Sequence, residues 1–424
     1  MQLPERDLID DCVHCGFCLP HCPTYQSWAE EMDSPRGRID LMRGLREKKT
    51  PLTPAVVAHF DRCLGCMACV TACPSGVKYD VLIEETRAMV ERDYPRRLFD
   101  RLHRALIFSL FPYPARLRVL VLLLLAYVKL RLRWLVRALG LTKLLPRRLA
   151  QLDELLPPLS AHQIFARLPE LTPAQGEKRA RVALISGCVQ RVFFPGVNEA
   201  TVRVLAAEGC EVLVPEPQGC CGALSMHAGR EPESLAFARA LIDRFEKLEV
   251  DAIVVNAAGC GSHLKDYGRL LGDERARAFA AKVRDVNEFL AALPPRAPRH
   301  PLKLRIAMHD ACHLAHAQRI TAQPRALLAG IPGATLLEVP DGGQCCGSAG
   351  IYNLVQPESS DEIGARKAGN VLATGADLIA SANPGCTMQI GKMLRARGKS
   401  IPAAHPIEIL DASIRGAPPE SLTA

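Results

Sequence analysis

The sequence lacks the features that mark secreted, membrane-spanning and nucleotide-binding chains. Its first ten residues hold no basic stretch followed by an apolar run, so we expect no secretory signal and a cytoplasmic location. The apolar run at 119–128 has ten residues, whereas a helix needs about 20 to cross a hydrocarbon core. The chain also contains no Gly-x-Gly-x-x-Gly loop for a dinucleotide.

Aromatic residues are scarce, at 5% of the 424 residues. The few in the most basic segment do not alternate with its Lys and Arg residues as stacking platforms would, so we expect no nucleic-acid partner. That segment, residues 95–150, holds thirteen Lys or Arg and one acid, a net of +12. The whole chain has a net charge of +8, so the remainder carries 8 minus 12, about −4. The basicity is therefore a local feature.

Cysteine, by contrast, is abundant, with 17 residues. In a reducing cytoplasm, metal thiolates are a better interpretation than disulfides. Eight cysteines form two C-x2-C-x2-C-x3-C-P runs, in which three thiolates hold one [4Fe–4S] cluster and the fourth reaches the other cluster. We predict one cluster on Cys12, Cys15, Cys18 and Cys73, and a second on Cys63, Cys66, Cys69 and Cys22. Zinc or simple buried thiols are the alternatives.

Eight further cysteines form a second repeated pattern, a lone Cys, a Cys-Cys-Gly and another lone Cys. The first group is Cys188, Cys220, Cys221 and Cys260, and the second is Cys312, Cys345, Cys346 and Cys386. Adjacent cysteines converge on one site only if the backbone turns sharply, which Gly222 and Gly347 permit. We predict two four-thiolate metal sites. An iron–sulfur cluster is favoured, zinc is the rival, and a thiol–disulfide site is the remaining alternative.

The two cysteine groups lie in an internal duplication. Their corresponding cysteines are 124, 125 and 126 residues apart (188 to 312, 221 to 346, 260 to 386). Short apolar strands alternate with helices in each copy, which predicts parallel α/β units with the lone cysteines beyond the carboxyl ends of strands. We therefore expect an α+β multidomain chain. Its parts are a helical ferredoxin-like domain with two 4Fe–4S motifs (1–94), a basic amphipathic connector and linker (95–178), and two Cys-Cys-Gly repeats (179–300 and 301–424).

The connector has its own pattern. Arg118, Lys129, Arg133 and Arg137 would form one stripe on a continuous helix, since 11 residues make close to three turns. An apolar helix with a basic stripe suits the surface of an anionic membrane. A helix packed against a partner subunit has the same composition.

Several residues near the cysteines have two interpretations. His263 stands three residues after Cys260 and is either a substitute ligand or an ordinary polar residue. His309, His313 and His316 flank Cys312 and either relay protons or form ordinary hydrogen bonds. Cys210 belongs to neither pattern and is expected to pack as a small apolar side chain.

Together these motifs resemble the iron–sulfur subunit of bacterial glycolate oxidase. The likeness runs from Cys12-Val-His-Cys-Gly-Phe-Cys and Ser34-Pro-Arg-Gly-Arg to His316-Ala-Gln and Cys345-Cys-Gly-Ser-Ala-Gly. The wider family includes subunits of anaerobic glycerol-3-phosphate dehydrogenase, lactate-utilisation proteins and heterodisulfide reductase. The fuller pattern of heterodisulfide reductase ends in Cys-x-x-Cys, but here its last position is His263 or Gln389.

The resemblance implies an electron-transfer subunit without catalytic residues of its own. Flavin-binding partner subunits, with FAD, would oxidise glycolate or another 2-hydroxy acid, and electrons would pass to an acceptor such as quinone. The chain would then lie on the inner face of the cytoplasmic membrane, in contact with it through 95–150. A subunit of glycerol-3-phosphate dehydrogenase and a disulfide reductase that uses the Cys-Cys-Gly sites are the alternatives.

Overall fold

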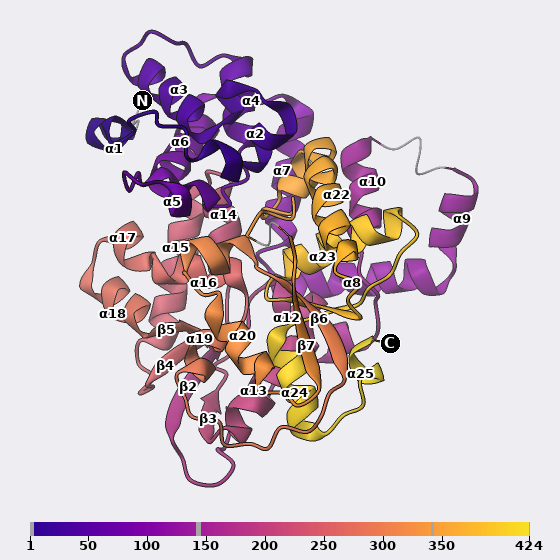
Figure 1. The fold of residues 1–424 in the computed structure, drawn as a ribbon. Helices are drawn as coiled ribbons and strands as arrows, with labels where there is room; N and C mark the ends of the chain where they lie inside the picture. Colours follow the sequence, from indigo (N-terminus) through magenta and orange to yellow (C-terminus); the bar gives the residue numbers. More distant parts are fainter. Residues whose placement is uncertain (1–3, 141–145, 341–342, 424) are drawn as a thin grey trace.

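A computed structural model describes residues 4–140, 146–340 and 343–423. Residues 4–94 form a helical domain, which lies above the two repeats (Figure 1). Its helices are α1 (Arg6–Asp10), α2 (Pro23–Trp28), α3 (Pro35–Arg46), α4 (Pro54–Arg62), α5 (Ala68–Ala72) and α6 (Tyr79–Asp93), with 3-10 turns at Leu19–His21 and Glu31–Asp33. Helix α6 covers the stretch 79–93, where apolar residues recur at the spacing that predicts a helix.

Local sequence signals fix where helices α3 and α4 begin. The hydroxyls of Ser34 and Thr53 accept hydrogen bonds from the backbone N–H groups of Gly37 and Val56 at 3.0 and 3.3 Å. A proline follows each cap at the first helical position, where its fixed φ suits the helix and no N–H is needed. At its other end, helix α4 stops at Arg62, directly before Cys63.

The first repeat is built on a five-stranded sheet of order β1-β3-β2-β4-β5. Strands β2, β3, β4 and β5 are parallel, as predicted, and the short edge strand β1 pairs antiparallel with β3 from the stretch expected to be linker. The strands are β1 (Leu171–Thr172), β2 (Ala180–Ile185), β3 (Cys210–Leu213), β4 (Ala252–Val255) and β5 (Val283–Asp285). The helices are α12 (Val189–Phe193), α13 (Pro195–Ala207), α14 (Ala223–His227), α15 (Glu231–Phe245), α16 (Ala258–Lys265), α17 (Tyr267–Leu271), α18 (Glu274–Lys282) and α19 (Val286–Ala291).

The second repeat reproduces this topology in the parallel order β7-β6-β8-β9. Its strands are β6 (Leu304–His309), β7 (Ala334–Glu338), β8 (Leu378–Ser381) and β9 (Ala403–Ala404). Its helices are α20 (Ala322–Ala329), α21 (Tyr352–Val355), α22 (Pro357–Ala373), α23 (Pro384–Ala396), α24 (Pro406–Arg415) and α25 (Glu420–Thr423), with a π-helical turn at His313–Ala317. The matching strand orders agree with a duplicated α/β unit.

One apolar core joins the two repeats. It combines side chains of β2 and β4 with side chains of β6 and β8, and helices α13 and α24 pack between them. The pair between Arg203 Nη2 and Asp411 Oδ2, at 2.8 Å, links the same two helices. Cys210 is fully buried in this core, as expected, and burial raises the pKa of its thiol to about 11. The sheets are therefore held in a fixed mutual orientation.

The connector departs from the prediction of one continuous helix. It forms α7 (Leu98–Leu110), α8 (Pro114–Lys129), α9 (Leu132–Ala138), α10 (Arg147–Leu155) and α11 (His162–Phe165). Arg131 has a φ of +56°, in the left-handed region, and this residue separates α8 from α9. Arg133 then pairs with Asp153 at 2.9 Å. Arg118 and Lys129 share α8, as the predicted stripe requires, but the stripe is wrong beyond Lys129 because Arg133 lies in the separate helix α9; the side chain of Arg137 lies outside the described residues.

The described ranges contain no single helix that is long and apolar enough to cross a membrane. Helices α7 and α8 reach that length and apolar composition only when taken together, and their axes are bent by 103° relative to each other.

Candidate metal centres

Four cysteines of the front domain line one pocket: Cys22, Cys63, Cys66 and Cys69. Cys22 precedes α2, Cys63 follows α4 and Cys69 lies in α5. The structure therefore brings Cys22 to the three thiols of the other run, the grouping that the C-x2-C-x2-C-x3-C-P rule predicts.

A buried arginine supplies positive charge to this pocket. The side chain of Arg38 is 1% exposed and bonds to Asp33 at 3.2 Å and to the His59 carbonyl oxygen at 2.7 Å. Burial raises the pKa of the Cys63 thiol, but the charges of Arg38 and Arg87 oppose burial, so the net pKa lies below its usual value. The Gly65 N–H donates to Cys63 Sγ at 3.4 Å and adds to this stabilisation of a thiolate.

The other front group is more open. Cys15 is exposed, while Cys12, Cys18 and Cys73 are partly buried against one apolar core. Burial, opposed by a hydrogen bond from the Arg36 backbone and assisted by the nearby Cys12 and Cys22, raises the pKa of the Cys18 thiol to about 11. The assignment of Cys73 to the same cluster as these three cysteines stays a prediction.

In the first repeat the structure brings all four patterned cysteines together. Cys188 Sγ lies 3.5 Å from Cys220 Sγ. Hydrogen bonds from Cys220 and then Cys260 lower the pKa of the Cys221 thiol well below its usual value. The hydrogen bonds with Cys188 and then Cys221 raise the pKa of Cys220, and the one with Cys221 raises the pKa of Cys260. The sulfur of Cys221 thus accepts hydrogen bonds from the thiols of Cys220 and Cys260.

The second repeat has the same arrangement. Hydrogen bonds with Cys345, Cys386 and then His309 lower the pKa of the Cys346 thiol, and a hydrogen bond with Cys312 is the largest cause that raises the pKa of Cys345. The turn that directs Cys345 and Cys346 to one site depends on Gly347, whose φ is +88°. A Cβ there would lie 2.5 Å from the Ser360 carbonyl oxygen, so only glycine fits.

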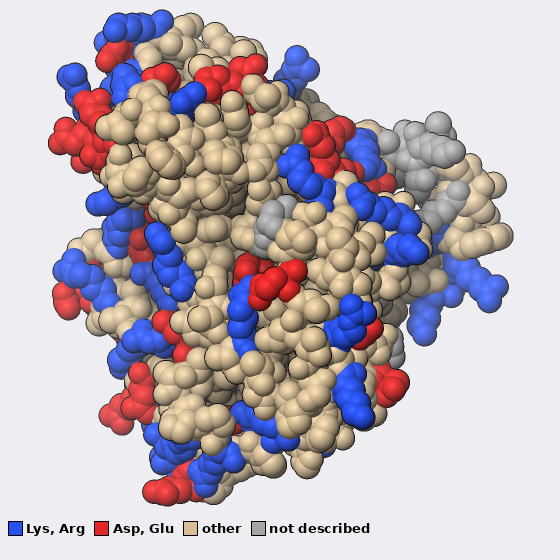
Figure 2. All heavy atoms as spheres, in the orientation of Figure 1, with Lys and Arg blue, Asp and Glu red and all other residues tan. Residues whose placement is uncertain are grey.

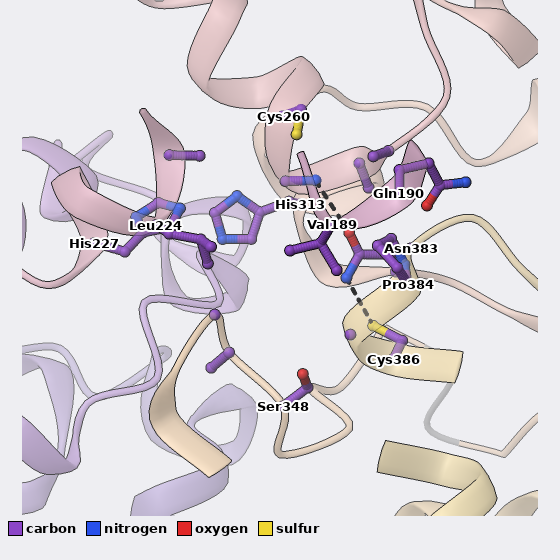
Figure 3. A pocket seen from close by; sticks show the side chains of 18 of the residues that line it. Val189, Gln190, Leu224, His227, Cys260, His313, Ser348, Asn383, Pro384 and Cys386 are labelled. Carbon is purple, nitrogen blue, oxygen red and sulfur yellow. Dashed lines mark hydrogen bonds between the residues drawn. The ribbon is translucent and has the colours of Figure 1, made fainter. Parts of the chain in front are cut away.

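The two four-thiol groups face one shared cavity of about 130 Å³, which all eight cysteines line. Figure 3 shows Cys260 and Cys386 on opposite sides of it, with Asn383 between them. The Asn383 side chain accepts a bond from the Gly259 N–H at 3.3 Å and donates to Cys386 Sγ at 3.6 Å. The carboxyl ends of the central strands from both sheets therefore meet at one place, as parallel α/β units predict.

These thiols fit metal ligation. Hydrogen bonds with neighbouring thiols, and then burial, raise the pKa of four of the eight thiols, so thiolates there need a strong positive charge nearby, and a bound metal deprotonates a coordinating thiol. Four sulfurs per site meet the needs of an iron–sulfur cluster and of tetrahedral zinc alike.

The position where the fuller family pattern has a fifth cysteine serves a structural role in both repeats. His263 Nε2 lies 3.0 Å from the Ser234 hydroxyl, and Gln389 Nε2 lies 3.0 Å from the Ser360 hydroxyl. Burial lowers the pKa of His263 to about 4, so its ring is neutral. The hydrogen bond to serine favours the ordinary polar interpretation of His263 over a ligand.

The front and back sites are neighbours. Cys66 shares a buried apolar cluster with Cys312 and Cys345. Burial raises the pKa of the Cys66 thiol, and the proximity of Cys312 raises it further. His313 Nε2 lies 3.0 Å from the carbonyl oxygen of Gly65 and ties the two segments together. Sequence reasoning did not reveal this contact, because 246 residues (312 minus 66) separate the two cysteines.

Sequence reasoning also underrated His309. Its imidazole is buried in a group with Cys346 and Cys386, and one ligand atom from each lies within 4.8 Å of the others. The available signal was its place as the last residue of a strand, three residues before Cys312.

Three family profiles match the chain. Residues 8–77 match a "4Fe-4S dicluster domain", and residues 99–156 match the "Glycolate oxidase iron-sulfur subunit, linker region". Residues 182–265 and 306–391 each match the "Cysteine-rich domain" named CCG. The dicluster and cysteine-rich matches indicate that the chain binds iron–sulfur clusters.

Two relatives are similar over nearly the whole chain. The probable glycolate oxidase iron–sulfur subunit of Bacillus subtilis (strain 168) is 38% identical, covering 96% of this chain and 94% of the relative. The glycolate oxidase iron–sulfur subunit of Escherichia coli (strain K12) is 33% identical, covering 97% and 96%. A crystal structure of a hypothetical protein from Helicobacter pylori has a TM-score of 0.51 and 10% identity, over 90% of this chain and 68% of that one, and shows a related fold alone.

The Cys-Cys-Gly turn gives a first prediction. Gly347→Ala adds a methyl group against the Ser360 carbonyl oxygen, so we expect loss of metal from the second site and a lower melting temperature. Gly398→Ala is the control: its φ is +65° but a Cβ there meets nothing within 4 Å, so it carries only the cost of a left-handed residue, about 1–2 kcal/mol. Full metal content and an unchanged melting curve in Gly347→Ala would show that the turn tolerates a side chain.

The buried arginine gives a second prediction. Arg38→Met removes the fully buried partner of Asp33, which keeps its contacts with His59 and Arg62. It also leaves the partly buried His59 carbonyl oxygen without this donor, so we expect the free energy of unfolding to fall by about 2 kcal/mol. Chemical denaturation followed by circular dichroism measures this change. Arg36→Met is the matched control, because Arg36 is 28% exposed and its pair with Glu31 is worth about 0–1 kcal/mol. Equal losses in the two variants would contradict a special role for Arg38.

Proposed function

The chain belongs to the family of glycolate oxidase iron–sulfur subunits, and from that premise we propose that it carries electrons from flavin-containing partner subunits to a quinone. The partner subunits would oxidise glycolate or a related 2-hydroxy acid, and this chain would contribute no catalytic residue to that step. The near full-length similarity to two glycolate oxidase subunits is the observation that carries the proposal.

The arrangement of the thiols supports an electron relay. Iron–sulfur clusters bound by these thiolates supply one-electron transfer. The protein keeps the thiols in contact and shields them: Cys66, Cys312 and Cys345 are each at most 8% exposed. Apolar neighbours such as Leu64 and Tyr352 complete this contact and exclude water. The second front run and the second repeat therefore form one continuous buried region.

We further propose that the chain lies on the inner face of the cytoplasmic membrane, attached through its connector. Seventeen large apolar side chains lie exposed in the described part of the chain, and twelve of them belong to residues 98–139. Exposed cations accompany them, among them Arg116, Lys129 and Arg131. Figure 2 shows blue side chains beside uncharged surface on the arm at the right, where Figure 1 places α9. Apolar surface flanked by positive charge suits an anionic bilayer.

The electron-transfer role is tested in the complex with its flavin-containing partners. Purified complex should reduce a quinone analogue with glycolate. Cys66→Ala should abolish this reduction, because it removes a predicted ligand of the front cluster that adjoins the second repeat. Cys210→Ala is the control, since Cys210 is buried in the core away from the patterned cysteines. Activity with glycerol 3-phosphate in place of glycolate, or with disulfides in the chain alone, would replace the proposal with one of those functions.

The membrane attachment predicts lipid-dependent flotation. The chain should float with vesicles that contain phosphatidylglycerol, and less with pure phosphatidylcholine or at high salt. Leu123→Glu combined with Leu130→Glu should weaken binding by about tenfold or more, given the free energy of burying leucine. Leu171→Glu, at an exposed leucine outside the connector, should leave binding unchanged. If the chain does not float while the partner subunits still bind its connector, the connector is a surface for those subunits and not for a membrane.

A further inference from the structure

The two repeats differ at one buried position beside their cysteine groups. Strands β2 and β6 end at Ile185 and His309, each three residues before the first cysteine of its group. The offset between them is 124 residues (309 minus 185), the same as between Cys188 and Cys312. An apolar side chain in the first repeat is therefore replaced by an imidazole in the second.

The protein satisfies the His309 ring only through sulfur. The side chain is buried, neither ring nitrogen has an oxygen or nitrogen partner among the residues that the structure describes, and its one polar interaction is with the Cys346 thiol. One ring nitrogen lies within 4.8 Å of the sulfurs of Cys346 and Cys386. Buried polar atoms are nearly always paired, because leaving them unpaired forfeits their hydration, so the ring is poised for a ligand beside these sulfurs.

The neighbouring histidines are different. His263 bonds to Ser234, and His313 bonds to Ser262 at 2.8 Å as well as to Gly65. His316 bonds to the Gly343 carbonyl oxygen at 2.6 Å and to Thr71 at 3.0 Å. Each of these rings has a protein partner that fixes it, whereas His309 has sulfur ligands of the second site beside it.

We propose that His309 is a ligand of the metal centre in the second repeat. That centre would then have four thiolates and one imidazole, whereas Ile185 leaves the first with four thiolates alone. Imidazole is a good ligand for both iron and zinc. The inference rests on the proposed role of the Cys-Cys-Gly cysteines as metal ligands, and it makes the two sites chemically unequal.

The extra ligand has a consequence for electron transfer. Histidine ligation raises the reduction potential of an iron–sulfur centre relative to thiolates alone. We therefore expect the second site to have the higher potential of the two. It is also the site whose Cys312 adjoins Cys66 of the front domain, so the asymmetry favours residence of electrons next to the front clusters.

The test uses the full chain labelled with nitrogen-15 histidine. Pulsed electron paramagnetic resonance of the reduced protein should show the coupling of a directly bound histidine nitrogen. His309→Ile, which copies the first repeat, should lose this coupling, and a redox titration should show a lower potential for one centre. His263→Gln is the matched control, because it copies Gln389, which keeps the bond to serine in the second repeat. If metal analysis finds zinc that is lost in Cys386→Ala, zinc-edge X-ray absorption replaces the resonance measurement and should show one nitrogen ligand.

The outcomes separate this inference from the proposed function. A second site loaded with metal but bound by sulfur alone, or a nitrogen signal that persists in His309→Ile, overturns the ligand role and leaves the electron relay intact. A second site that holds no metal overturns both the ligand role and the metal role of those cysteines. If His309→Ile does not fold, the spectrum of the unchanged chain decides between nitrogen and sulfur ligation.

Discussion

The burial of sulfur against sulfur is the constraint on which the rest of this structure depends. Burial raises the pKa of thiols such as Cys66 and Cys69, and thiolates brought together in the interior repel one another. At Cys63 the protein itself supplies compensating charge, from Arg38 and Arg87. At the Cys-Cys-Gly sites a bound metal is the group that removes both penalties, so the two sheets, their glycine turns and the shared core hold the thiols in place for it.

Duplication has produced two sites with one plan and unequal chemistry. Both repeats use a glycine turn and a serine that bonds to the fifth position, with His263 in one and Gln389 in the other. The difference between Ile185 and His309 lies at the end of equivalent strands, where a change of side chain alters the site without altering the sheet. The geometry that both repeats share therefore lies in the glycine turn, and the side chain that differs lies at the end of a strand.

The connector combines two tasks in one segment. On its inner side Leu117 and Val121 are fully buried against Val192, which anchors α8 to the first repeat. On its outer side Leu122, Leu123 and Trp134 are exposed, so the same segment offers apolar surface to a bilayer or a subunit. This two-sided packing explains why the segment is apolar well beyond what its own fold requires.

The cysteine groups, the duplication and most of the strands can be predicted from the sequence alone, because these depend on local spacing and on the periodicity of apolar residues. Strands β2 and β6 and helix α6 lie where that periodicity places them. It missed the break at Arg131, because a left-handed residue other than glycine has no strong local signal. Three features emerge only from the folded chain: the two four-thiol groups share one cavity, Cys66 adjoins Cys312, and His309 lies beside the sulfurs of Cys346 and Cys386. Those are contacts between distant segments, and they follow from how two sheets and a helical domain pack, which no local pattern records.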